Sequence, residues 1–232
     1  MRFSLGGYLK KTRKPVAVIF GAGSKYNNEN NSANTPATIR WGLGGALSQR
    51  FAKDYTVVLM SRRPHELFDL LEEIKLQGGH AVPIACDVTK DEAVKSAFKK
   101  ASKIGNIEIL IYNAAPPYPP GSTFSKMPLP HEFDPNHLQR GFDVGVTGCL
   151  RCVQNIIKPM LEAGKGKILI TGATQALRGA AGFSSMSPIK FALRSLSQSL
   201  FQAYASRGVH VSHVVIDGPI DSPGIRKQIE KT

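Results

Sequence analysis

The stretch Val16-Ala-Val-Ile-Phe-Gly-Ala-Gly-Ser24 decides the fold, because five apolar residues run directly into two closely spaced glycines. A strand without polar alternation is typical of the centre of a parallel sheet, where both faces are buried. Five further short runs are expected to form strands of the same sheet: residues 55–60, 81–85, 107–112, 167–171 and 209–216.

Amphipathic stretches of helical length separate these strands, at residues 43–53, 65–77, 91–104, 137–162 and 187–207. The third is expected to begin at a capping box, Thr89-Lys-Asp-Glu92, in which the Thr and Glu side chains satisfy free backbone amides. Buried strands that alternate with helices predict a doubly wound α/β fold, with a parallel sheet covered on both faces.

Length and composition indicate one globular domain over residues 1–232. Hydrophobic residues make up 42% of the chain and charged residues 20%, as in ordinary folded proteins. Two segments interrupt the alternation of strands and helices. Residues 25–40 are Asn-rich and are expected to be an insertion in the glycine-rich loop, and residues 113–135, with seven prolines, are expected to be an active-site loop.

The formal net charge is +13, and residues 1–28 contain basic but no acidic side chains. Such a balance suits a polyanion: nucleic acid, a membrane surface, or a phosphorylated cofactor and substrate. A solvated basic tail is the simplest interpretation. Nucleic-acid binding is not expected, since the basic residues lack interleaved aromatic residues and any known motif. No apolar run is long enough for a membrane span.

Three cysteines are too few for a disulfide framework, so a reducing compartment is expected. Cys149 and Cys152 have C-x-x-C spacing, but they fall inside a helical pattern and are interpreted as buried thiols. The default location is therefore cytoplasmic, with an organelle left open by the basic N-terminus.

The glycine-rich segments predict a dinucleotide site. Glycines between a strand and a helix let the backbone turn tightly and approach a pyrophosphate at the helix N-terminus. The candidate cradle follows the first strand and resumes before the first helix; its residues are Gly21, Gly23, Ser24, Gly42, Leu43 and Gly44. Trp41, the single tryptophan, is expected beside the cofactor phosphates.

The second strand ends in Ser61-Arg62-Arg63, where a protein that prefers NAD would carry an acid for the ribose diol. Guanidinium groups suit a 2′-phosphate instead, through charge-assisted bidentate bonds. The sequence therefore predicts NADP(H) as the cofactor, with Arg62 as the main contact and Ser61 beside it.

These features resemble the short-chain dehydrogenase/reductase family, whose single Rossmann domain has the predicted architecture. The glycine loop matches its first motif, with Phe20 in place of Thr. The resemblance implies cofactor contacts at three further places: Asp87-Val88 against adenine, Asn113-Ala114 after the fourth strand, and Gly218, Ile220 and Ser222 along the nicotinamide. Asp217 stands where that last motif usually has Pro.

The resemblance also locates the catalytic positions. Lys190 matches the family's Lys, which holds the nicotinamide ribose. The Tyr position falls on Met186, the Ser position on Ala173 with Thr174 adjacent, and the Asn position on Gly145. A thioether cannot donate a proton, so carbonyl reduction through the usual Tyr is not expected.

Three functions stay open at this point. The first is an NADP(H)-dependent oxidoreductase of a small carbonyl or activated C=C substrate. The second is an enoyl- or dienoyl-thioester reductase, since Phe183-Ser-Ser-Met186-Ser-Pro-Ile-Lys190 is similar to the Tyr-x-x-Met-x-x-x-Lys pattern of enoyl reductases; a CoA or carrier-protein thioester would then suit the basic surface. The third is a catalytically silent NADP(H)-binding protein.

The resemblance carries two further expectations. Family members usually continue into a seventh strand, whereas only ten residues follow Ser222, so about six strands are expected here. The helices over 137–162 and 187–207 are similar to the pair through which family members associate, so a homodimer or homotetramer is expected.

Overall fold

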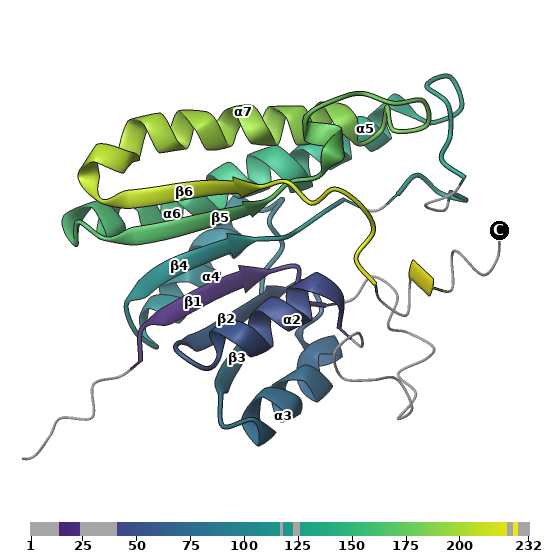
Figure 1. Ribbon diagram of the computed structural model, residues 1–232. Helices are drawn as coiled ribbons and strands as arrows, with labels where there is room; N and C mark the ends of the chain where they lie inside the picture. The colour runs from purple at the N-terminus through teal and green to yellow at the C-terminus, as the bar shows by residue number, and fades with distance from the viewer. Residues whose placement is uncertain (1–13, 24–40, 117, 123–125, 222–224, 227–232) are drawn as a thin grey trace, which may run out of the picture.

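In the part of the chain that the structure describes, six strands form one parallel sheet in the order β3-β2-β1-β4-β5-β6 (Figure 1). They are β1 (Val16–Phe20), β2 (Thr56–Ser61), β3 (His80–Ala85), β4 (Ile107–Tyr112), β5 (Gly166–Thr171) and β6 (Val209–Val214). Every neighbouring pair runs parallel. From β1 the chain proceeds to β2 on one side, and β4 lies on the other. The predicted doubly wound sheet is confirmed, and its switch point lies between β1 and β4.

The computed structural model describes residues 14–23, 41–116, 118–122, 126–221 and 225–226. Ser24, Ser222 and the insertion expected over residues 25–40 lie outside the described residues. In the described part, no helix combines the length and the apolar character that crossing a membrane requires.

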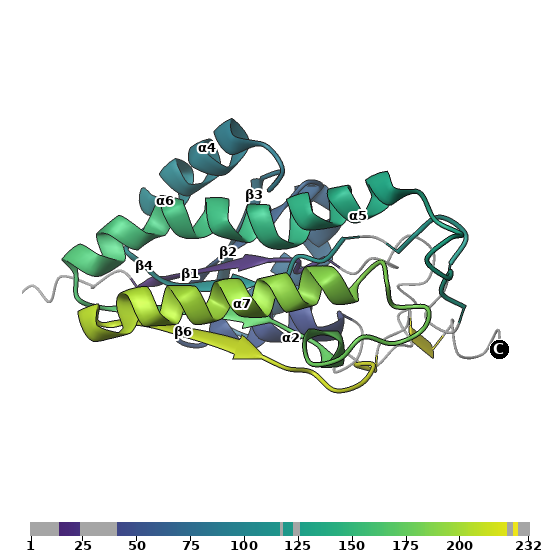
Figure 2. The ribbon, with the colours of Figure 1, turned by 90° about the horizontal axis from the view of Figure 1, so that it is seen from above.

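Helices cover both faces of the sheet, as predicted. On one face lie α2 (Gly42–Phe51), the short 3-10 helix η1 (Pro64–Leu67) and α3 (Phe68–Leu76). On the other lie α4 (Asp91–Ser102), α6 (Gly148–Glu162) and α7 (Ser187–Tyr204). Seen from above, α6 and α7 run alongside each other over this second face (Figure 2).

The apolar run of β1 is buried completely and serves two cores at once. Val16, Val18 and Phe20 pack into the cluster beneath α4, α6 and α7. Ala17 and Ile19 point the other way, into the cluster beneath α2 and α3. Successive side chains of a strand point to opposite faces, so a strand between two helical layers must be apolar throughout.

The helix predicted over residues 137–162 contains a π-helical turn. The structure has α5 (Pro135–Phe142), the π-helical segment η2 (Asp143–Thr147) and then α6, in direct succession. Asp134 caps α5 by accepting a hydrogen bond from the amide of Asn136 at 2.8 Å. The hydrophobic spacing alone could not reveal the wider turn, which inserts one extra residue into the helix.

The capping box expected at Thr89-Lys-Asp-Glu92 is wrong. The residue before α4 is Lys90, and no side chain caps the helix there. The Thr89 hydroxyl instead donates to Asp87 at 2.8 Å. A carboxylate two residues earlier competes successfully for the hydroxyl, which ties Thr89 to the loop rather than to the helix.

Candidate cofactor and active site

The glycine loop is packed so closely that side chains are excluded at two positions. Gly21 has φ +73°, and a Cβ there would lie 2.4 Å from the carbonyl oxygen of Asn113. A Cβ on Gly44 would lie 2.0 Å from the carbonyl oxygen of Gly21. The Asn113 side chain in turn donates to that same Gly21 oxygen at 3.0 Å. Gly21, Gly44 and Asn113 therefore form one unit at the switch point of the sheet.

Trp41 immediately precedes α2, and its indole packs into the core between α2 and α3. The ring is buried beside Gly45, where a Cβ would lie 2.0 Å from Trp41 Cβ. Its Nε1 donates to Glu73 on α3 at 2.6 Å. The indole therefore anchors α2 to α3. The backbone of Trp41 continues into Gly42 and Leu43, the first residues of α2.

The two arginines after β2 have different environments. Arg63 pairs with Glu66 at 3.1 Å, and its amide donates to the Ser61 hydroxyl. Arg62 is exposed and makes no hydrogen bond or ion pair to any part of the chain that the structure describes. Its guanidinium is therefore available to an external anion, whereas that of Arg63 is engaged.

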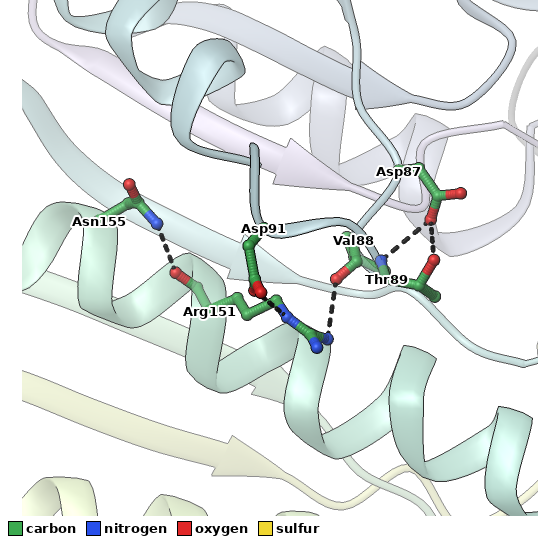
Figure 3. Close-up of polar contacts among 6 residues, drawn as sticks. All are labelled: Asp87, Val88, Thr89, Asp91, Arg151 and Asn155. Carbon is green, nitrogen blue, oxygen red and sulfur yellow. Dashed lines mark hydrogen bonds and ion pairs between the residues drawn. The ribbon is translucent and has the colours of Figure 1, made fainter. Parts of the chain in front are cut away.

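Asp87 lies after β3, and its carboxylate is held by Thr89. The amide and the hydroxyl of Thr89 both donate to Asp87 Oδ1, at 2.9 and 2.8 Å (Figure 3). Burial acts to raise the pKa of Asp87, but these hydrogen bonds and the nearby charge of Arg62 outweigh it and hold the pKa below its usual value. Asp87 is therefore an oriented acceptor at neutral pH.

The loop that carries Asp87 and Val88 is fastened to α6 by Arg151. The guanidinium pairs with Asp91 and donates to the Val88 carbonyl oxygen at 3.4 Å (Figure 3). Arg151 thus positions the loop that is expected to contact adenine. No motif in the sequence singled out Arg151, because its partners are about 60 residues away in the chain.

Lys190 lies in the first turns of α7, and its side chain is buried. Its Nζ donates to the carbonyl oxygen of Thr171, the last residue of β5, at 2.9 Å. Burial lowers the pKa of Lys190 to about 8, because the surroundings disfavour the charged form. The ammonium group is thus held at the carboxyl edge of the sheet, which is the edge that also carries Gly21 and Asn113.

The positions matched to the family's Tyr and Asn carry side chains that cannot do their chemistry. Met186 is half-buried directly before α7 and has no proton to give. At Gly145, a Cβ would lie 2.5 Å from Ile189 Cγ2, so an Asn side chain would collide with α7 as it is packed here. Around Met186, three buried hydroxyl groups have no hydrogen-bond partner within the described residues: Ser184, Ser185 and Ser187.

Beyond β5 and β6, Thr174 and Asp217 meet through their side chains. The Thr174 hydroxyl donates to the Asp217 carboxylate. In the sequence, Thr174 stands beside the position of the family's Ser and Asp217 replaces a Pro of a different motif, and no local pattern indicates that the two touch. They are 43 residues apart, and only the parallel pairing of the two strands brings them together.

His213 on β6 is a further polar group at this edge. A Cβ on Gly172 would lie 2.2 Å from the His213 ring, so the two strands pack tightly there. Burial lowers the pKa of His213, and the charges of Lys190 and Arg194 lower it further. The ring is therefore neutral at physiological pH. The sequence of β6 did not indicate that His213 lies close to Lys190 and Arg194.

The last expected contacts lie in the segment after β6. Gly218 has φ +137°, and both it and Ile220 are exposed. A Cβ on Gly23 would lie 3.5 Å from Leu67 Cδ2, which is an ordinary contact distance. The residues that follow Gly23 lie outside the described part. Ala114 packs against the core beneath α6. Apart from Lys190 on α7, the expected residues that the structure describes thus lie at or after the carboxyl ends of β1, β2, β3, β4 and β6 or, over residues 42–44, begin α2.

Comparison with known proteins agrees with this arrangement. Residues 39–232 match the family model described as short chain dehydrogenase. A cis-4-hydroxycyclohexanecarboxylate dehydrogenase from Sinomonas cyclohexanicum is 27% identical over 90% of this chain and 74% of its own length. A fatty acyl-CoA reductase from Mycobacterium tuberculosis is 30% identical over 73% of this chain. That match spans just over half of the reductase, at 56%.

A solved short-chain dehydrogenase from Rhodopseudomonas palustris shares the fold. It is 25% identical, the match covers 89% of this chain and 86% of the other, and the TM-score is 0.73. The family model covers far more than half of the chain, and the sheet order, glycine loop and buried lysine are in place. This chain belongs to the short-chain dehydrogenase family, oxidoreductases that bind a nicotinamide cofactor and act on small molecules.

Proposed function

We propose that this protein is an NADP(H)-dependent dehydrogenase that interconverts a small alcohol and its carbonyl compound. The observation that carries the choice of cofactor is the guanidinium of Arg62 directly after β2, where NAD selectivity would require an acid. This group has no hydrogen-bond or ion-pair partner in the part of the chain that the structure describes. Among the described residues Arg62 forms no direct ion pair, although its charge acts on the nearby Asp87 carboxylate, so a 2′-phosphate would meet it without breaking a salt bridge.

The residues present fit a dinucleotide. Gly21 and Gly44 let the turn after β1 pack directly against the start of α2 and the backbone of Asn113, an approach that a Cβ would block. A pyrophosphate would lie at the helix N-terminus that this close approach sets beside the turn. Asp87 offers an oriented carboxylate to the adenine amino group, and Lys190 offers ammonium protons to the ribose hydroxyls. Ser61 and Arg62 would hold the 2′-phosphate, and Gly218 and Ile220 would lie along the nicotinamide, which supplies or accepts hydride when bound.

Two observations support alcohol oxidation over other reactions. The relative from Sinomonas cyclohexanicum, whose match extends over most of this chain, is named for dehydrogenation of a cyclic secondary alcohol. In addition, Thr174 and Asp217 supply a hydroxyl and a carboxylate in contact at the edge where Lys190 lies. These groups can exchange a proton with a substrate oxygen even though Met186 cannot.

A second candidate is reduction of an α,β-unsaturated thioester. It is favoured by Met186 and Lys190 at the spacing of enoyl reductases, and by the relative from Mycobacterium tuberculosis named as a fatty acyl-CoA reductase. Reduction of a conjugated C=C bond needs stabilisation of an enolate rather than a strong acid near the hydride. The net charge of +13 would favour an acidic CoA or carrier-protein substrate.

The experiment that separates these functions follows the absorbance of the reduced cofactor. The purified protein is given NADP⁺ with cis-4-hydroxycyclohexanecarboxylate, NADPH with the matching ketone, and NADPH with crotonyl-CoA, each also with NAD(H). We expect turnover of the alcohol and the ketone with NADP(H). Turnover of crotonyl-CoA alone would establish the thioester reductase. Cofactor binding without any turnover would indicate a silent NADP(H)-binding protein.

A further inference from the structure

Strands β5 and β6 deliver two polar side chains to the same point. The strands pair in register from Gly166 and Val209 to their last residues, Thr171 and Val214. The amide of Gly172 then donates to the Val214 carbonyl oxygen at 2.7 Å, which extends the pairing beyond the strands. Thr174 and Asp217 each lie three residues past a strand end, and the Thr174 hydroxyl donates to the Asp217 carboxylate.

The buried lysine contacts the backbone that leads to this pair. Lys190 Nζ donates to the carbonyl oxygen of Thr171, three residues before Thr174. On the far side of Thr174, the short 3-10 helix η3 (Thr174–Ala176) is held by α7, because Arg194 donates to the Ala176 carbonyl oxygen at 3.4 Å. Two bonds from α7 therefore fix the loop on either side of Thr174.

The chemistry of the pair has a direction. A threonine hydroxyl that donates its proton to a carboxylate still has free lone pairs, so Thr174 Oγ1 can accept a hydrogen bond from a third group. Asp217 is exposed to solvent, so a proton that reaches it can leave to water. The arrangement thus suits removal of a proton from a bound hydroxyl group.

We propose that Thr174 and Asp217 form a proton relay that takes the place of the tyrosine absent at Met186. This inference rests on the proposed function. The substrate hydroxyl donates to Thr174 Oγ1. A bound oxidised nicotinamide would take up the hydride of the substrate C–H bond as the C=O bond forms. The hydroxyl proton moves to Thr174 Oγ1, the Thr174 proton moves to Asp217, and Asp217 releases it to water. Reduction runs the same transfers in reverse.

In this relay Thr174 is the catalytic residue that touches substrate, and Asp217 acts through it. The chain departs from the family pattern at Ala173, which replaces the Ser, and at Asp217, which replaces a Pro. The two departures explain each other, because the Thr174 hydroxyl next to Ala173 can pass on a proton only when the Asp217 carboxylate is there to accept it. Lys190 keeps its role at the ribose and takes no part in the proton transfer.

Four variants test the relay against a purely structural bond. Asp217→Asn keeps an oxygen that accepts from Thr174 but removes the carboxylate that takes up a proton. Thr174→Val removes the hydroxyl, and with it both the hydrogen bond to Asp217 and the proton transfer. Thr174→Ser keeps a hydroxyl at this position. Asp54→Asn is the matched control, since Asp54 is an exposed carboxylate that pairs with Arg50 and lies before β2, at the opposite end of the sheet.

Two readouts are compared for each variant. Hydrogen exchange over residues 214–221 of the cofactor-free protein reports whether the two loops stay tied. The kcat and KM for cis-4-hydroxycyclohexanecarboxylate with NADP⁺ report the relay. We expect Asp217→Asn to keep wild-type exchange and KM while kcat falls by about a hundredfold or more, the usual size of an acid–base contribution. Thr174→Val should accelerate exchange and lower kcat, Thr174→Ser should recover both in large part, and Asp54→Asn should change neither.

A kcat for Asp217→Asn within about threefold of wild type would overturn the relay, since a loss of that size is far below an acid–base contribution. The relay would also be overturned if the wild type bound NADP(H) but did not oxidise the alcohol. That result would leave the proposed cofactor site intact. Absence of NADP(H) binding would instead remove the proposed function itself. A separate fluorescence titration of NADPH therefore distinguishes failure of the relay from failure of the cofactor assignment.

Discussion

The side-chain amide of Asn113 donates to the carbonyl oxygen of Gly21 at 3.0 Å and so joins the carboxyl ends of β4 and β1 across 92 residues of sequence. The bond lies at the switch point of the sheet, where the strand order reverses and doubly wound proteins bind their ligands. It also explains why Gly21 cannot carry a side chain, because the backbone of Asn113 occupies the space.

The first prediction concerns that close approach. Gly21→Ala introduces a Cβ 2.4 Å from Asn113 O in addition to an unfavourable φ of +73°. Gly164→Ala is the matched control, because Gly164 has φ +61° but nothing within 4 Å of its Cβ position. We expect the control to lose about 1 kcal/mol in the free energy of unfolding and Gly21→Ala to lose about 3 kcal/mol. Urea unfolding measures both, and equal losses would contradict the packing described.

The second prediction separates the two arginines after β2. Arg62→Ala should weaken NADPH binding about tenfold to hundredfold, the effect of losing one charge-assisted contact, and should leave NADH binding unchanged. Arg63→Ala should have a much smaller effect, because Arg63 is already paired with Glu66. Titrations of both cofactors against both variants test this. A larger loss in Arg63→Ala than in Arg62→Ala would reverse the assignment.

The third prediction follows from the buried ammonium group of Lys190. Its pKa is about 8 in the folded protein against 10.5 as the ordinary value, so between these values the unfolded chain binds more protons. The contribution of Lys190 to the free energy of unfolding therefore rises with pH over this interval, and the cost of burying the charge is fully present below about pH 8.

Comparison with Lys190→Met isolates that contribution. Relative to the variant, the wild type should gain up to about 3 kcal/mol between about pH 7 and about pH 10. The carbonyl of Thr171 loses its donor in the variant at every pH, so this loss shifts the curve without changing its slope. Parallel curves for the two proteins, measured by urea unfolding, would show that Lys190 is not buried in the charged form.

Part of the site was predictable from the sequence and part was not, for a physical reason. The apolar run of β1 and the glycines that follow it are local signals, so the central strand, the turn and Gly21 could be read directly. Side-chain contacts such as Arg151 with Val88 depend on loops that the fold brings together, and no local pattern encodes them.

The capping box at Thr89 fails for a local reason. The spacing to Glu92 fits a cap, but Asp87, two residues before Thr89, accepts the hydroxyl. The indole of Trp41 has a tertiary partner instead, because it fills the space beside Gly45 and donates to Glu73, 32 residues away in the chain. A contact of that kind has no local signal in the sequence.

The fourth prediction concerns the cysteines. Cys86, Cys149 and Cys152 are free and buried, and burial raises the pKa of Cys86 to about 11 and that of Cys149 to about 12. The thiolate is the reactive form, so the folded protein should not react with a disulfide reagent near neutral pH. In urea all three thiols should react. A fast-reacting thiol in the folded state would revive the C-x-x-C spacing as a redox motif.

The proposed function depends most directly on binding of NADP(H) at the carboxyl edge of the sheet, with Arg62 at the 2′-phosphate. The direct measurement titrates NADPH and NADH separately against the wild type and follows the fluorescence of Trp41 and its energy transfer to the reduced nicotinamide. The account predicts saturable binding of NADPH, at least about tenfold weaker binding of NADH, and loss of that difference in Arg62→Ala. Equal affinity for the two cofactors, or no binding of either, would contradict it.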